Sequence, residues 1–165
     1  MIPDWLKLWD ESLIEMSKAA AKRHNLDYKW VLAIVQVESA GVPARMKYEP
    51  DYKWLHKPEF YAKRLGIDVP TETQLQKFSY GLMQVMGGVA REWGYGDSLA
   101  LLVDPFRSLE YGCRHLASKR HKYPTGRDWI ASYNSGSPRK RPDGSYANEN
   151  YVKKVVAFWN DLSDT

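Results

Sequence analysis

The chain has 165 residues, a usual size for one globular domain, and its 44% hydrophobic and 27% charged residues exclude a largely disordered protein. Its single cysteine, Cys113, cannot form an intramolecular disulfide, and the longest apolar run, Val31 to Val35, is far too short to cross a membrane. The net charge of +4 at pH 7 favours anionic partners in general, such as nucleic acid, membrane surfaces or the bacterial cell wall.

Helical periodicity dominates the N-terminal part of the chain. A first helix with one apolar face is predicted by residues at helical spacing, namely Trp5, Leu8, Trp9, Leu13 and Met16. A second helix is predicted from Tyr28 towards Ala40, because Asp27 is a suitable N-cap and Gly41 and Pro43 are suitable terminators.

The stretch from residue 42 to residue 78 has no regular pattern because prolines interrupt it repeatedly, at Pro43, Pro50, Pro58 and Pro70. A short helix over 58–64 and a small β excursion are the regular elements expected there. After Gly81 we expect helical spacing to resume and to end at Gly94, through Leu82, Val85, Val89 and Trp93.

The C-terminal part is predicted to form three more helices. One begins with Asp104 and Pro105 and continues to about Tyr123, and a short one covers 129–133 and ends at Asn134 and Gly136. A polar loop over 135–145 follows, and the last helix is marked by Tyr151, Val152, Val155, Val156 and Trp159.

The pattern as a whole contains no alternating strand set and no internal repeat. It predicts an all-α or predominantly α fold of about six or seven helices, with a small β excursion allowed in 42–78. One domain over residues 1–165 is expected.

Glu38 occupies an unusual position in the second helix. With Val31, Ile34 and Val35 it falls at i, i+3, i+4 and i+7, so its carboxylate projects from the face expected to pack inward. A buried carboxyl group needs partners or a raised pKa, and a raised pKa suits a general acid. The other interpretation is a glutamate at a helix end that turns to solvent or pairs with Arg45, and periodicity alone favours it.

Three short motifs, in order, support the catalytic interpretation. They are Glu38-Ser39 at a helix end, YGLMQV at 80–85 and YNSG at 133–136. Together they resemble the soluble lytic transglycosylases, which are related to goose-type lysozyme, from about residue 28 to 159. Asn150-Tyr151-Val152 is similar to the start of the closing helix of that family. The KYEP sequence at 47–50 is similar to a stretch that is common in its phage-encoded members. Residues 42–78 lie mostly outside the matched motifs.

The resemblance implies a lysozyme-like domain with an active-site cleft and a peptidoglycan substrate. It implies cleavage of the β-1,4 bond between N-acetylmuramic acid and N-acetylglucosamine, with Glu38 protonating the leaving oxygen. Ordinary glycosidases use two carboxylates. The resembled family uses one, which then takes the proton of the C6 hydroxyl as a 1,6-anhydro ring closes without water.

The resemblance also implies a set of substrate-binding residues: Ser39, Gly81, Leu82, Met83, Gln84, Tyr133, Asn134 and Tyr151. Several have structural alternatives, since Leu82 fits a core stripe and Asn134 fits a helix cap. Glu49 is a candidate second acid. If it faced the cleft it could bind sugar hydroxyls, stabilise the positive centre or position a water, and the last role would make the enzyme a hydrolase.

Three other functions are weighed against transglycosylation. A hydrolytic muramidase on the same fold differs only in the attacking nucleophile, and a catalytically silent wall-binding module would suit the 7 Trp and 11 Tyr. Nucleic-acid binding is disfavoured, because the basic run 139–141 lies in a polar loop and no recognition motif accompanies it. The histidines lack metal-site spacing, so no metal or cofactor is expected.

The N-terminal segment has the acidic residues Asp10, Glu11 and Glu15 and does not resemble a secretory signal. We therefore expect synthesis in the cytoplasm and action on the bacterial wall, as a phage lysis protein released by a membrane-permeabilising partner or as a virion-borne enzyme. We expect a monomer without stable membrane insertion.

Overall fold

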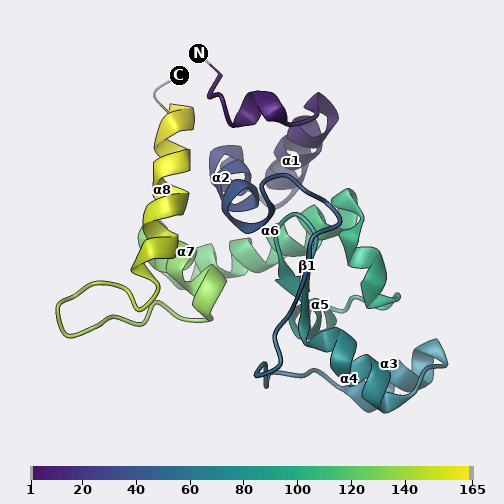
Figure 1. The fold of residues 1–165 in the computed structure, drawn as a ribbon. Coiled ribbons are helices and arrows are strands. Elements are labelled where there is room, and N and C mark those ends of the chain that lie inside the picture. Colours follow the sequence, from purple (N-terminus) through teal and green to yellow (C-terminus); the bar gives the residue numbers. More distant parts are fainter. Residues whose placement is uncertain (1, 164–165) are drawn as a thin grey trace. The chain divides into compact units, whose positions relative to one another are not determined.

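The computed structural model describes residues 2–163 and divides into two compact units, residues 1–41 with 113–165 and residues 42–112 (Figure 1). The helices are α1 Glu11–Arg23, α2 Tyr28–Ser39, α3 Pro58–Leu65, α4 Val69–Gln76, α5 Gly87–Glu92, α6 Pro105–Lys122, α7 Gly126–Ser135 and α8 Glu149–Ser163. Two 3₁₀ helices, η1 Leu6–Leu8 and η2 Leu99–Val103, and the strands β1 Met46–Tyr48, β2 Phe78–Tyr80 and β3 Val85–Met86 complete the described elements.

This architecture confirms the predominantly helical fold with a small β element. Of the strands, β1 lies within the expected stretch 42–78, β2 begins at its last residue, and β3 lies beyond it. The eight α-helices exceed the predicted number within the described residues, because α4 forms in the proline-rich stretch. Asp68 caps α4 by accepting a hydrogen bond from the backbone N–H of Thr71, and Pro70 stands in the first turn, where a missing N–H costs nothing. The prediction of one domain stays a prediction.

In the first unit, helix α2 packs against α1 and α8, and α7 packs against α8 (Figure 1). Its cap is the predicted one, since the Asp27 carboxylate accepts a hydrogen bond from the backbone N–H of Lys29. Residues 31–35 are all fully buried, so the middle of α2 is buried on every side rather than along one stripe. Leu32 lies in a core cluster with Leu6 and Leu162.

The end of α2 is fixed by two consecutive residues in the left-handed region. Ala40 has φ 53° and Gly41 has φ 76°. A Cβ atom on Gly41 would lie 2.8 Å from two atoms of the Trp9 ring, so only glycine fits there. The chain therefore turns sharply one residue after Ser39, and Glu38 lies on the last turn of the helix.

In the second unit, β2 pairs antiparallel with both β1 and β3, with Met46 opposite Tyr80 and Ser79 opposite Met86. The helix predicted to resume after Gly81 is wrong in its first half. Gly81 has φ 72° and Gln84 has φ 48°, and neither value fits an α-helix. The apolar spacing misled because Leu82 and Val85 are buried in a turn and a strand.

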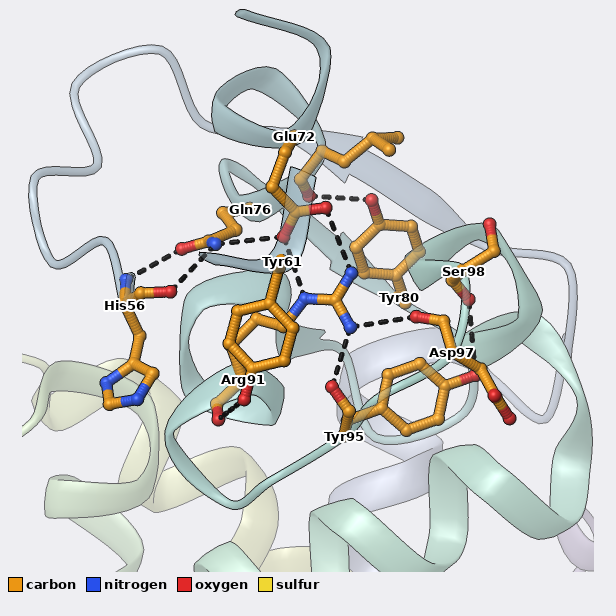
Figure 2. A network of polar contacts seen from close by, with 10 residues as sticks. His56, Tyr61, Glu72, Gln76, Tyr80, Arg91, Tyr95, Asp97 and Ser98 are labelled. Carbon is orange, nitrogen blue, oxygen red and sulfur yellow. Dashed lines mark hydrogen bonds and ion pairs between the residues drawn. The ribbon is translucent and has the colours of Figure 1, made fainter. Parts of the chain in front are cut away.

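A buried ion pair ties together the helices of the second unit (Figure 2). Arg91 on α5 donates from Nε and Nη2 to the two oxygens of Glu72 on α4, at 2.7 and 2.9 Å, and both side chains are fully buried. Its Nη1 donates to the carbonyls of Tyr95 and Asp97 at 2.6 and 2.8 Å. The guanidinium carbon lies 4.3 Å from the centre of the Tyr61 ring. Each charge is therefore compensated inside the protein.

Candidate active site

Glu38 is half-buried near the end of α2 and receives a hydrogen bond from α8. The Tyr151 hydroxyl donates to Oε1 of Glu38 at 2.7 Å. Since α2 and α8 pack against each other, the hydrogen bond joins two helices of one unit. Tyr151 was predicted as a substrate contact, and the structure gives it a direct contact with the proposed acid.

Tyr133, on α7, is the second tyrosine close to this carboxyl group. Burial raises the pKa of Tyr133 well above its ordinary value, and the negative charge of Glu38 raises it further. Burial also raises the pKa of Tyr151, again with Glu38 as the next cause. Both phenols therefore stay protonated at neutral pH and remain hydrogen-bond donors beside Glu38.

Tyr151 also lines an open pocket with a volume of about 320 Å³ at the start of α8. Its other lining residues are Arg141, Ala147, Asn148, Glu149 and Asn150. Tyr151 is thus common to this pocket and to the hydrogen bond with Glu38.

His115, on α6, belongs to the same group of side chains, and sequence analysis missed it. Its ring lies 5.4 Å from that of Tyr133, between centroids, at an interplanar angle of 55°. Burial lowers the pKa of His115 to about 3, and the positive charge of Lys119 lowers it too. The imidazole is therefore neutral at physiological pH and supports the Tyr133 ring without adding charge near Glu38. In the sequence the histidines were assessed only for the spacing of metal ligands, and that criterion does not detect a histidine that packs against a tyrosine.

Asn134 is exposed and accepts a hydrogen bond from a residue that sequence analysis also missed. The Asn148 amide donates at 2.9 Å to Oδ1 of Asn134 and at 3.0 Å to the carbonyl of Ala131. The backbone carbonyl of Asn148 accepts a hydrogen bond from the backbone N–H of Val152 in α8. Asn148 thus joins α7 to the start of α8, and the signal available in the sequence was an asparagine just before a helix.

Ser39 is fully buried, and its hydroxyl donates to the carbonyl of Val35 one turn earlier, at 3.1 Å. This hydrogen bond inside α2 gives the side chain a structural partner. Contact between Ser39 and a substrate stays a prediction.

The second unit holds the residues of the YGLMQV motif, and each has a structural role there. A Cβ on Gly81 would lie 2.5 Å from Oγ of Ser108, and Leu82 and Met83 are fully buried. The Gln84 amide donates to the carbonyls of Arg45 and Gly81 at 3.0 and 2.8 Å. Gln84 therefore stabilises its own turn, and substrate contacts of the motif stay predictions.

Glu49 is also in the second unit, where it forms an ion pair with Lys47 at 2.7 Å. Its carboxylate side chain is 40% exposed, and its backbone N–H donates to the carbonyl of Lys77. Glu49 thus has a structural partner on the protein surface. A catalytic role for it stays a prediction.

The model of the transglycosylase SLT domain family matches residues 15–156, a span that contains Glu38, the YGLMQV motif and the YNSG motif. The chain belongs to this family. It is therefore a lysozyme-like SLT domain that acts on peptidoglycan as a lytic transglycosylase. None of the curated proteins compared with it matches significantly.

Within residues 2–163, no group of three or more histidine, cysteine, aspartate or glutamate side chains could hold a metal ion. Across the same residues, no helix combines the length and the hydrophobicity that a membrane span needs.

The hydrogen bond from Tyr151 leads to a first prediction for the SLT domain. Tyr151→Phe removes one hydrogen bond to a charged group, so we expect kcat for peptidoglycan cleavage to fall by about 10- to 100-fold. The measurement is release of soluble muropeptides from purified sacculi over time. Tyr28→Phe, at an exposed tyrosine of α2, is the matched control and should be silent. Equal effects of the two variants would refute a catalytic contribution of the Tyr151 hydroxyl.

Proposed function

We propose that this SLT domain cleaves the β-1,4 bond between N-acetylmuramic acid and N-acetylglucosamine without water, with Glu38 as both acid and base. The product at the cut end is a 1,6-anhydromuramic residue. The observation that supports this most directly is the hydrogen bond between Tyr151 and Glu38, at 2.7 Å, which orients one carboxyl group on a helix end.

In the first step, protonated Glu38 donates its proton to the bridging oxygen, and the bond between that oxygen and C1 of the muramic residue breaks. Positive charge develops at C1, where the oxygen of the sugar's own N-acetyl group stabilises it. The buried hydroxyls of Tyr133 and Tyr151 stay neutral donors, which suits the carboxylate that Glu38 becomes.

In the second step, the Glu38 carboxylate takes the proton of the C6 hydroxyl of the same muramic residue. The C6 oxygen attacks C1 and closes the anhydro ring, so that Glu38 regains its proton and the cycle is complete. Every proton moves through one carboxyl group, and no water is consumed.

A mechanism with a single carboxyl group is consistent with the partners of other acids in the first unit. Asp128 accepts hydrogen bonds from the Thr125 and Tyr146 hydroxyls at 2.6 and 2.7 Å. Glu149 forms an ion pair with Arg127 at 2.7 Å. Both acids hold α7, α8 and the intervening loop in place, so each has a structural reason to be there.

The test is the mass of the released muropeptides after digestion of purified sacculi in heavy-oxygen water. We expect anhydro products that are one water lighter than the reducing forms and that carry no heavy oxygen. Reducing products with heavy oxygen at C1 would refute the proposal in favour of a hydrolytic muramidase. In that case Glu49→Gln should abolish release if Glu49 positions the attacking water.

A further inference from the structure

The second unit presents large apolar side chains to solvent along one short segment. We call residues 46–60 the aromatic segment. Trp54 is 74% exposed and Phe60 is 56% exposed, while Met46 and Tyr48 are more than 40% exposed. A mostly exposed indole ring contributes little to the stability of the fold, because that contribution comes from burial. Exposed apolar side chains that lie close together often mark a binding surface.

The segment is held rigidly at His56 by the buried network described above (Figure 2). The Gln76 side chain accepts a hydrogen bond from the backbone N–H of His56 at 2.7 Å and donates to its carbonyl at 3.0 Å. Gln76 also donates to Glu72 at 2.9 Å, and Glu72 is held by Arg91. A fully buried ion pair thus fixes the backbone two residues after Trp54.

A second anchor lies beneath Trp54 itself. A Cβ atom on Gly88, in the first turn of α5, would lie 2.5 Å from the Trp54 carbonyl oxygen and 2.9 Å from the Tyr52 ring. The segment therefore packs directly on the helix backbone, and only glycine allows that approach. The rings of Tyr52 and Trp54 meet edge to face at 5.5 Å between centroids. Trp54 is consequently oriented before any ligand arrives, which lowers the entropic cost of binding.

The exposed rings, rather than the charges, indicate the chemistry of a ligand. The segment has three lysines and three acids, so its formal charge is zero: Lys47, Glu49, Asp51, Lys53, Lys57 and Glu59. Exposed aromatic faces stack on the C–H faces of sugar rings. A peptidoglycan strand is a sugar polymer that offers such faces, and it is the substrate of this SLT domain.

We infer that the aromatic segment, through Trp54 and Phe60, is an additional glycan-binding surface that holds the enzyme on insoluble peptidoglycan. The inference rests on the proposed function only in taking peptidoglycan as the substrate. Trp54 and Phe60 lie outside the short motifs quoted for the family, so those motifs do not account for the two rings. Binding here raises the time that the enzyme spends on the wall and does not alter the chemical step.

The experiment measures affinity for purified sacculi, free of teichoic acid and lipid, by co-sedimentation in a Glu38→Gln background that leaves the wall intact. We expect the Trp54→Ala, Phe60→Ala double variant to bind about tenfold more weakly. Phe106→Ala, at an aromatic of α6 in the same unit that is 54% exposed, is the matched control and should bind normally. With Glu38 present, cleavage of short soluble muropeptide oligomers should be unchanged by the double variant.

Three outcomes would overturn the inference. Unchanged affinity of the double variant for sacculi would exclude a binding role. An equal loss on sacculi and on soluble oligomers would assign the rings to the cleavage site. Binding only to walls that retain teichoic acid, or to anionic lipid vesicles, would assign the segment to a different ligand. Failure of the proposed function is distinguishable, because it would appear as absent anhydro product while sacculus binding still depended on Trp54.

Discussion

Glu38→Gln is expected to lower the rate of peptidoglycan cleavage by at least about a thousandfold, because one group donates and accepts every proton in the proposed cycle. The amide has the same shape as the carboxyl group and can still accept the hydrogen bond from the Tyr151 hydroxyl. The variant should therefore fold normally and bind sacculi normally. The measurement is muropeptide release at equal protein concentration, with thermal unfolding as the check on folding.

The matched control is Glu15→Gln, which removes one carboxylate from an exposed position of α1 in the same unit. It should leave the cleavage rate unchanged. A Glu38→Gln protein that keeps more than about a tenth of the wild-type rate would contradict the assignment of Glu38 as acid and base. The search for the catalytic carboxyl group would then turn to other acids, beginning with Glu49.

Breaking the Glu72–Arg91 ion pair should have the largest effect on stability. Both side chains are fully buried. Arg91→Met leaves the Glu72 carboxylate buried without its cation, and we expect the free energy of unfolding to fall by about 3–5 kcal/mol. The measurement is urea denaturation at pH 7, supported by hydrogen exchange of amides in α4 and α5.

Two further variants test whether the loss of stability comes from the unpaired buried charge of Glu72. Adding Glu72→Met to Arg91→Met removes the unpaired charge and should recover part of the loss, since apolar replacement of a whole buried pair is often tolerated. Lys18→Met, which breaks the exposed pair with Glu15, should cost less than about 1 kcal/mol. If Arg91→Met cost no more than Lys18→Met, the ion pair would not be important for stability.

The sequence was sufficient to locate elements whose signals are local. Asp27 caps α2 as predicted, and Gly136 ends α7. Pro58 begins a short helix as predicted. A cap, a proline or a left-handed glycine acts within a few residues, so its effect can be read from neighbouring positions. The order of three motifs likewise indicated the family, and the match to residues 15–156 confirmed it.

Local signals failed where tertiary contacts set the backbone. The spacing of Leu82 and Val85 fitted a helix, but left-handed φ values at Gly81 and Gln84 produce a turn that leads into β3. The apolar spacing around Glu38 was likewise insufficient to define an inward face of α2. Residues 31–35 are buried on all sides of α2, so the apolar stripe did not distinguish one face from another.

The sequence by itself determined the helical class, several helix ends and the identity of the candidate acid, because these depend on short-range geometry and on a recognisable order of motifs. The first helix was placed too early, since α1 begins at Glu11 and leaves Trp5, Leu8 and Trp9 outside it. Only the tertiary structure decided what surrounds that acid. Tyr151 lies 113 residues from Glu38 and Arg91 lies 19 from Glu72, and no periodicity links either pair. Such contacts arise when packed helices bring distant side chains together, and a linear pattern does not encode which of many polar residues will meet.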